Sequence, residues 1–253
     1  MGAQGITPSS QMVTGAPTPN WSRVNPGNSH GCRVVNSRVF LLSPANCSGT
    51  RARMAMAPEA RFALAAELRT DAGARLGDVF SFMSGLYFRG KLAYARRFAH
   101  PPDPADHVVG GGVLVITPNS GLRSADTPVT VGSIRAFAST SIDLENPDYL
   151  DPLQRSARVL LEAVGPDCDV VLLGSIASDK YVDVLMPLFG ERLLFPTAFV
   201  GRGDMSRGGL MLRHAEDGVE LEYAPIAGAI RHGARPPRLT PRTYRTVRTI
   251  RTP

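Results

Sequence analysis

The sequence has very little lysine. Its 253 residues include two lysines and twenty-six arginines. Both lysines, Lys91 and Lys180, fall in polar segments, which makes them candidates for one shared functional site. An arginine-rich composition in which two lysines remain by chance explains the same count, so both interpretations stay open.

Cysteine, clustered histidine and long apolar runs are also scarce. The three cysteines have no paired spacing and the five histidines are scattered, so no disulfide framework or metal site is indicated. No stretch approaches the roughly 20 apolar residues of a membrane-spanning helix. Residues 1–38 also lack the apolar core of a secretory signal. We therefore expect a cytoplasmic protein with no membrane partner, metal or cofactor.

The formal charge of +6 is divided unevenly along the chain. Residues 231–253 contain seven arginines and no acid, and residues 1–38 contain three arginines and no acid. The part between them therefore carries a formal charge of −4. We predict a disordered N-terminal extension (1–37), a single α/β domain (38–230) and a basic tail rich in Arg, Thr and Pro (231–253).

The end of the basic tail has an arginine at every third position: Arg242, Arg245, Arg248 and Arg251. Each of these arginines can neutralise one phosphate, which would give affinity for nucleic acid that depends on salt and not on base sequence. The alternative is a solvated tail without a specific partner.

Three short apolar runs predict buried strands, at residues 39–42, 113–116 and 170–173. Further strands are expected at 192–195, 209–212 and 220–223, and residues 201–209 are expected to form a mobile turn. Amphipathic patterns predict helices at 58–68 and 87–99, from Asp151 to Val164, and from Ser178 or Asp179 to Phe189. This alternation predicts an α/β fold with a mainly parallel or mixed sheet flanked by helices and disordered tails.

Each of the three apolar runs leads into a loop of small, polar, Gly- or Pro-bearing residues, namely 43–49, 117–126 and 174–181. In a parallel sheet these loops emerge at the same carboxyl edge, where open α/β folds bind ligands. Turns generally require such residues, so the composition of one loop alone would indicate nothing. The predicted ligand-binding residues are Ser43, Asn46, Ser48, Lys91, Asn119, Arg123, Ser175, Ser178, Lys180 and Tyr181, with Lys180 and Asp126 as catalytic candidates.

Short motifs over residues 39–200 resemble the YaaA-like peroxide-stress proteins. Ser43-Pro-Ala-Asn46 is similar to the family's Ser-Pro-Ala-Lys, and residues 121–126 and 176–181 are similar to its second and third motifs. The segment 86–91 lies where the family has a Gly-x-x-Tyr element. Asn46 replaces a family Lys and Lys180 replaces a family Glu. The resemblance implies a DNA-associated role in limiting oxidative damage.

Two functions are consistent with these patterns. The favoured one is a nucleic-acid-associated stress-response protein whose carboxyl-edge pocket binds a nucleotide or base, with DNA or a nucleotide as its partner. The alternative is an enzyme acting on a nucleobase or nucleotide, either a glycosidase or a base-modifying enzyme.

Overall fold

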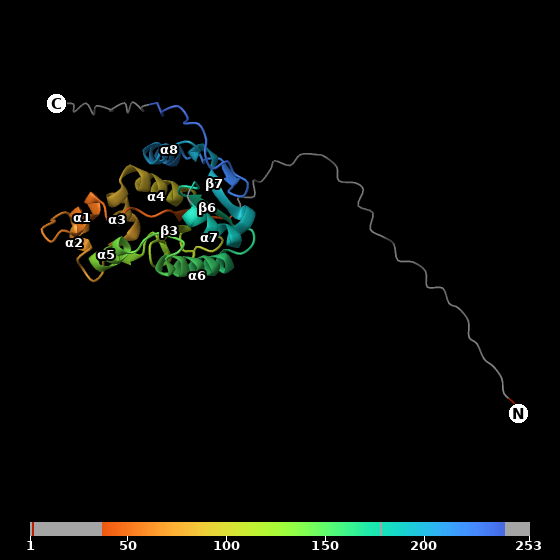
Figure 1. The fold of residues 1–253 in the computed structure, drawn as a ribbon, viewed down its shortest axis with the longest axis horizontal. Coiled ribbons are helices and arrows are strands. Elements are labelled where there is room, and N and C mark those ends of the chain that lie inside the picture. Colours follow the sequence, from red (N-terminus) through yellow and green to blue (C-terminus); the bar gives the residue numbers. More distant parts are fainter. Residues whose placement is uncertain (1, 3–36, 178, 241–253) are drawn as a thin grey trace, which may run out of the picture. The chain divides into compact units, whose positions relative to one another are not determined.

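The computed structural model describes Gly2 and residues 37–177 and 179–240 (Figure 1). Outside the described residues therefore lie the expected N-terminal extension up to residue 36 apart from Gly2, Ser178, and the tail arginines Arg242, Arg245, Arg248 and Arg251. In the described part the predicted fold class is confirmed, because a six-stranded, mostly parallel sheet is flanked by helices.

The sheet has the strand order β4-β3-β1-β6-β7-β8. The inner strands β3, β1, β6 and β7 are parallel, while β4 and β8 pair antiparallel at the two edges. The expected runs 39–42, 113–116 and 170–173 form β1, β3 and β6, so these predictions are confirmed. The strand bounds are β1 Arg38–Leu42, β3 Val113–Thr117, β4 Gly121–Ser124, β6 Asp169–Leu173, β7 Leu193–Pro196 and β8 Tyr223–Pro225, with β2 Ala74–Arg75 and β5 Pro128–Val129 forming a small second sheet.

Alternate residues of the central strands enter two separate cores. In β1, Phe40 and Leu42 belong to one apolar cluster, while Val39 and Leu41 belong to the other. Because side chains alternate across a strand, one helical layer covers each face of the sheet. Figure 1 shows α4 and α8 above the sheet and α6 below it.

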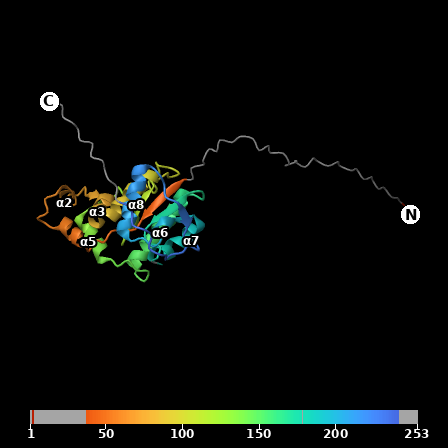
Figure 2. The ribbon, with the colours of Figure 1, turned by 90° about the horizontal axis from the view of Figure 1, so that it is seen from above.

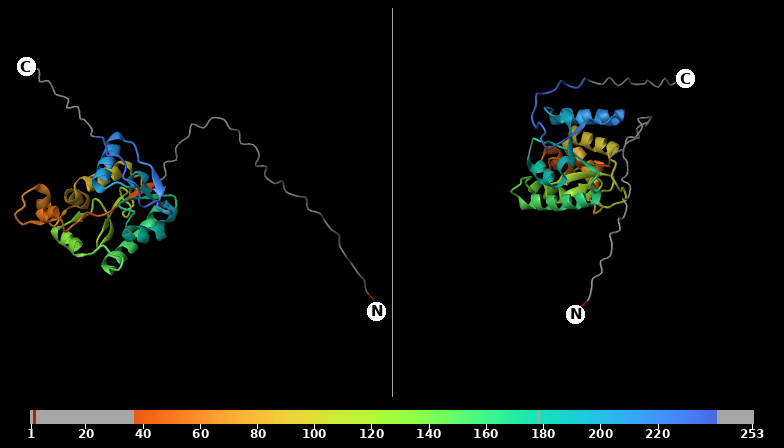
Figure 3. Two further views of the ribbon diagram at one scale, coloured as in Figure 1. Left: turned by 45° about the horizontal axis from the view of Figure 1, so that its top comes forward. Right: turned by 90° about the vertical axis from the view of Figure 1, so that its right-hand side faces the viewer.

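The first layer contains α1, α3, α4, α5 and α8, and the second contains α6 and α7. Helix α8 packs along the outer side of α4 (Figures 2 and 3). The helix bounds are α1 Thr50–Met56, α2 Ala63–Glu67, α3 Leu76–Ser84, α4 Leu86–Phe98, α5 Val131–Ser139, α6 Pro147–Val164, α7 Asp179–Phe189 and α8 Asp204–Asp217, with short 3-10 turns η1 Gly190–Arg192 and η2 Thr197–Phe199.

Several expected elements differ from the structure. The strand expected at 220–223 shares only Tyr223 with β8, and of the helix expected at 58–68 only Ala63–Glu67 is helical, as α2. The strand expected at 209–212 and much of the turn expected at 201–209 belong to α8. The helix expected to begin at Asp151 begins four residues earlier, because the Asn146 side chain accepts a hydrogen bond from the Asp148 amide at 3.1 Å and Pro147 occupies the first turn. The glycines within residues 201–209 are typical of turns, which explains the error at α8. The sequence pattern places Pro152 at the first helical position of α6, where the structure has Pro147.

The segment 231–240, which the sequence assigns to the tail, contacts the domain. Arg231 forms an ion pair with Asp179 at 2.8 Å, and the Pro237 carbonyl accepts a hydrogen bond from Arg202 at 3.3 Å. Leu239 packs against the first core. These residues of the predicted tail therefore pack against the domain.

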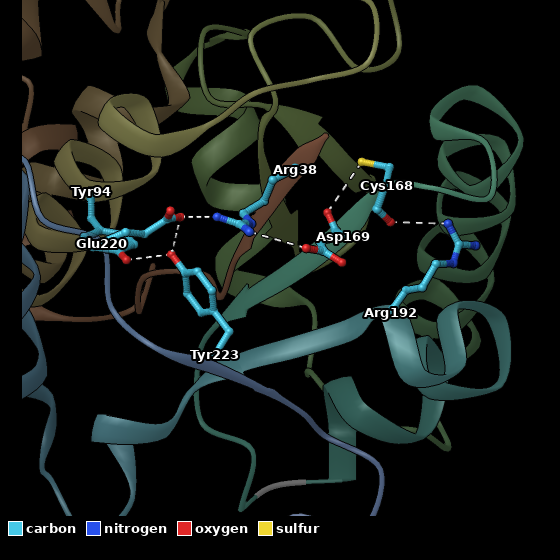
Figure 4. A network of polar contacts seen from close by, with 7 residues as sticks. All are labelled: Arg38, Tyr94, Cys168, Asp169, Arg192, Glu220 and Tyr223. Carbon is cyan, nitrogen blue, oxygen red and sulfur yellow. Dashed lines mark hydrogen bonds and ion pairs between the residues drawn. The ribbon is translucent and has the colours of Figure 1, made fainter. Parts of the chain in front are cut away.

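A polar network holds the amino end of β1 (Figure 4). Arg38 bonds to Glu220 and to Asp169, the latter at 3.3 Å. Tyr223 donates to Glu220 at 2.9 Å and lies 2.5 Å from the Tyr94 hydroxyl. The network ties the central strand to its neighbour and to the segment before β8, at the end of the sheet opposite the predicted site.

Candidate functional site

The loops after β1 and β3 and the start of α7 meet around one pocket of about 390 Å³ at the carboxyl edge of the sheet. The first loop contributes residues 44–48, the second Pro118, and α7 contributes Lys180 and Tyr181. The end of α5 and the following loop close the remaining side with Phe137, Ala138, Thr140 and Ile142. Parts of the three segments that the sequence predicts to converge therefore line one pocket, the third through the first turn of α7.

Local hydrogen bonds hold the pocket walls in place. The Asn46 side-chain oxygen accepts a bond from the Ser48 amide at 2.9 Å, which shapes the loop after β1. The Ser48 hydroxyl contacts the Ala138 carbonyl at 3.4 Å and so links this loop to α5. On the opposite wall, Tyr149 donates to the Lys180 carbonyl at 2.7 Å, which joins the start of α7 to α6.

Asn119 lies with Ser120 in a neighbouring pocket of about 600 Å³, whose other lining residues come from α5, α6 and the segment between them. Its amide is 3.3 Å from the Thr140 hydroxyl, and Thr140 lines both pockets. The structure therefore places Asn119 beside the main pocket and not within it.

Arg123 and Asp126 are not brought into the pocket. Gly121 adopts a positive φ of 67°, and the chain turns back along β3 as β4, so Arg123 lies opposite Val115 within the hairpin. Asp126 is exposed and bonds to Arg96 at 2.8 Å. Asp126 therefore lies outside the pocket for which the sequence nominated it as a catalytic group.

The remaining candidates lie at or behind the carboxyl edge. Ser175 follows β6 and is partly buried, but it does not line the main pocket, and Ser178 is outside the described residues. Ser43 directly precedes the pocket wall and is 6% exposed, while Lys91 is fully buried.

Lys91 extends from α4 to the end of β1. Its ammonium or amine nitrogen Nζ donates to the Ser43 carbonyl oxygen at 2.6 Å and lies 2.9 Å from the Ser43 hydroxyl oxygen Oγ. It also lies over the Tyr87 and Phe88 rings, at 4.4 and 4.8 Å from their centroids. No carboxylate among residues 37–177 and 179–240 forms an ion pair with it.

The surroundings of Lys91 favour its neutral form. Burial lowers its pKa from 10.5 to about 7; the charge of Asp204 opposes this change and that of Arg207 adds to it. The Tyr87 hydroxyl, one helical turn before Lys91, is buried and has no hydrogen-bond partner in the described part of the chain. Burial also raises the pKa of Tyr87, so this hydroxyl keeps its proton.

Two glycines allow α8 to approach Lys91. A Cβ on Gly90 would lie 2.5 Å from the Gly208 carbonyl oxygen, and a Cβ on Gly208 would lie 2.6 Å from the Leu86 carbonyl oxygen. Larger residues would hold the two helices apart. The close crossing is therefore what brings the charges of Asp204 and Arg207 near the buried lysine.

Sequence reasoning omitted Tyr87, Phe137, Thr140 and Arg207 from the site. Tyr87 precedes Lys91 by four residues on a predicted helix, which places both on one face and was an available signal. Phe137 and Thr140 belong to a helix end that had no predicted element. Arg207 fell in the segment interpreted as a turn, so its approach to α4 could not be anticipated.

Cys47 lines the pocket as a protonated thiol, since burial raises its pKa to about 12. No group of three His, Cys, Asp or Glu side chains suited to a metal ion occurs in the described ranges. None of the helices formed by these residues is both long and apolar enough to cross a membrane. Comparisons with protein-family models, curated proteins and solved structures find no match to this chain.

Proposed function

We propose that the carboxyl-edge pocket binds a nucleobase or nucleotide, in a cytoplasmic protein that associates with nucleic acid during stress response. The observation that carries the proposal is the meeting of three separate loops around one pocket. Its volume of about 390 Å³ falls within the range of roughly 300–1,000 Å³ typical of small-molecule sites.

The chemistry of the pocket wall suits such a ligand. Phe137 and Tyr181 supply aromatic surface for a planar base, and the Lys180 amine supplies a positive charge for a phosphate. The Asn46 side-chain oxygen is engaged by Ser48, which leaves its NH2 group to donate to a base edge.

Calorimetric titration with nucleobases, nucleosides and nucleotides tests the proposal. We expect one of these ligands to bind, and Lys180→Ala and Asn46→Ala to weaken that binding about tenfold or more, as loss of a hydrogen bond to a charged or polar ligand group does. Arg123→Ala and Asp126→Ala are matched controls, because these residues lie outside the pocket, and they should bind as the wild type does. Equal losses in all four variants, or no binding by the wild type, would refute the proposal.

A second candidate function is an enzyme that acts on the bound base or nucleotide. The buried Lys91 beside Ser43 favours it, because strongly perturbed titratable groups concentrate at catalytic sites. Lys180 lines the pocket and remains a candidate general acid or base. Asp126 lies outside the pocket, bonded to Arg96, and has no access to a bound ligand. Release of a free base or modified nucleotide, lost in Lys180→Ala, would support this function.

A further inference from the structure

We propose that Ser43 is a nucleophile and Lys91 its general base, together forming a centre that hydrolyses a small acyl compound such as an ester, thioester or amide. This inference goes beyond the proposed function, because it requires no nucleotide. It rests on the contacts of two side chains that lie 48 residues apart in the sequence and meet at the end of β1.

The hydrogen bonds around Nζ suit a neutral amine. A neutral lysine has two N–H groups and one lone pair. In the structure Nζ donates to the Ser43 carbonyl oxygen at 2.6 Å and to Ser43 Oγ at 2.9 Å, while the Ser43 hydroxyl donates to the Leu173 carbonyl oxygen at 3.4 Å. Because this last bond is long, rotation of the hydroxyl would turn its proton towards the lone pair of the neutral amine. The rotated arrangement is the one that a serine nucleophile and its base require.

Burial without a counter-ion favours the neutral amine. Lys91 has no exposed surface, and the described residues provide no carboxylate within ion-pair distance. The lowered pKa of about 7 agrees with this geometry and would leave much of the lysine able to accept a proton near neutral pH.

Of the two groups, Ser43 lies nearer to the pocket and keeps some exposed surface. Lys91 is fully enclosed, whereas Ser43 keeps 6% exposure and is followed directly by Pro44, the first residue of the pocket wall. Gly174 allows this placement, since a Cβ there would lie 3.0 Å from the Ser43 Cβ. Ser43 adjoins the pocket lining but is not part of it, so a reacting group has to pass Pro44 to meet the hydroxyl, and Lys91 lies behind that hydroxyl.

The free donor beside this pair suits acyl chemistry. The Tyr87 hydroxyl has no hydrogen-bond partner in the described chain, and the Tyr87 ring lies beside the pair, with its centroid 4.4 Å from Lys91 Nζ. One donor can stabilise the single oxyanion of a tetrahedral intermediate. Phosphoryl transfer usually uses several cations, yet two nitrogens of nearby Arg207 are already bonded to the Phe199 carbonyl.

The reaction has two balanced halves. Ser43 Oγ attacks the acyl carbon as its proton passes to Lys91 Nζ; the bond to the leaving group then breaks, and the leaving group takes that proton. Water next attacks the acyl-serine ester, giving a proton to Lys91, which returns it to Ser43 Oγ as the carboxylic acid departs. Water is the sole co-reactant.

Labelling with a fluorophosphonate, which reacts with activated serines, tests the inference on the full chain. Mass spectrometry should locate the label on Ser43, with a rate that rises with pH to a plateau and has its midpoint near pH 7. Ser43→Ala should abolish labelling, and Lys91→Met should slow it about 100-fold or more, the usual contribution of a general base.

Ser141→Ala is the matched control, because Ser141 is an exposed serine between two pocket residues, and it should label at the wild-type rate. Absence of label on Ser43 in the wild type would overturn the inference, and so would a Lys91→Met rate equal to that of the wild type. If Lys91→Met does not fold, the wild-type pH profile decides, since an unassisted serine shows no plateau above pH 7. Nucleotide binding is measured on the same preparations, and its outcome is independent of whether Ser43 is labelled.

Discussion

The buried Lys91 and the partly buried Arg38 are basic side chains at opposite ends of β1, and their surroundings differ. Arg38 bonds to two carboxylates, Asp169 and Glu220, and joins β1 to neighbouring segments. Lys91 has no carboxylate partner among the described residues and contacts a serine at the carboxyl edge. At the residue scale this contrast indicates a structural role for Arg38 and makes Lys91 a candidate functional group.

Lys91→Met should change how stability depends on pH. The folded-state pKa of about 7 lies below the unfolded value of 10.5, so the unfolded chain binds more protons between these values. The wild type should therefore become more stable as the pH rises from 7 towards 8.5. Ionisation of the two buried cysteines in the unfolded chain, with an ordinary pKa of 9.0, opposes this gain near pH 8.5 but is the same in Lys91→Met. Urea unfolding at pH 6.5 and 8.5 should show this gain in the wild type and lose it in Lys91→Met; identical slopes would contradict the assignment.

Arg38→Met should destabilise the fold by about 2 kcal/mol, because it leaves the Asp169 and Glu220 carboxylates without their cation. The estimate is below the 3–5 kcal/mol of a fully buried pair, because these carboxylates are partly exposed. Urea unfolding at pH 7 measures it. A loss below about 0.5 kcal/mol would show that the network contributes as little as a surface ion pair.

At the element scale, the crossing of α4 and α8 positions the charges near Lys91. Gly90→Ala or Gly208→Ala should destabilise the fold by about 1–3 kcal/mol, the usual cost of overpacking, because each new Cβ would overlap backbone atoms of the other helix. Gly209→Ala is the matched control in α8, since its Cβ would lie 3.6 Å from Leu239 Cδ1. Thermal unfolding should show the losses at 90 and 208 alone; equal effects at all three positions would contradict the packing.

The elements differ in how well the sequence predicted them, for physical reasons. Short apolar runs bounded by turn residues identified β1, β3 and β6, because buried parallel strands require such runs. The start of α8 was not predicted, because the glycines that permit its contact with α4 are also typical of turns.

The candidate site was predictable in its location but only partly in its residues. Strand order and the carboxyl-edge rule brought Asn46, Lys180 and Tyr181 together. The hairpin that removes Arg123 from the edge depends on the conformation of Gly121, and the Ser43–Lys91 contact depends on the register of α4 against β1. Neither feature is encoded in a local pattern.

At the scale of the whole molecule, the basic tail should determine affinity for nucleic acid. The residues 231–240 contact the domain, so a chain ending at residue 240 keeps those contacts and loses the four regularly spaced arginines. If each arginine neutralises one phosphate, the slope of log affinity against log salt for duplex DNA should fall in magnitude by about 3.6. Fluorescence anisotropy with a short DNA measures this slope.

A full-length chain with glutamine at Arg242, Arg245, Arg248 and Arg251 is the control for loss of length alone, and it should behave as the shortened chain does. An unchanged salt slope in both proteins would show that the tail does not bind phosphates.

The most direct measurement of the central claim is a map of ligand-induced changes in backbone amide NMR signals. Titration with the tightest-binding base or nucleotide should shift the signals of Asn46, Ala138, Lys180 and Tyr181, which surround the carboxyl-edge pocket. Arg123 and Asp126 should stay unchanged. Shifts that gather around Arg123 and Asp126, or that appear nowhere in the domain, would contradict the account.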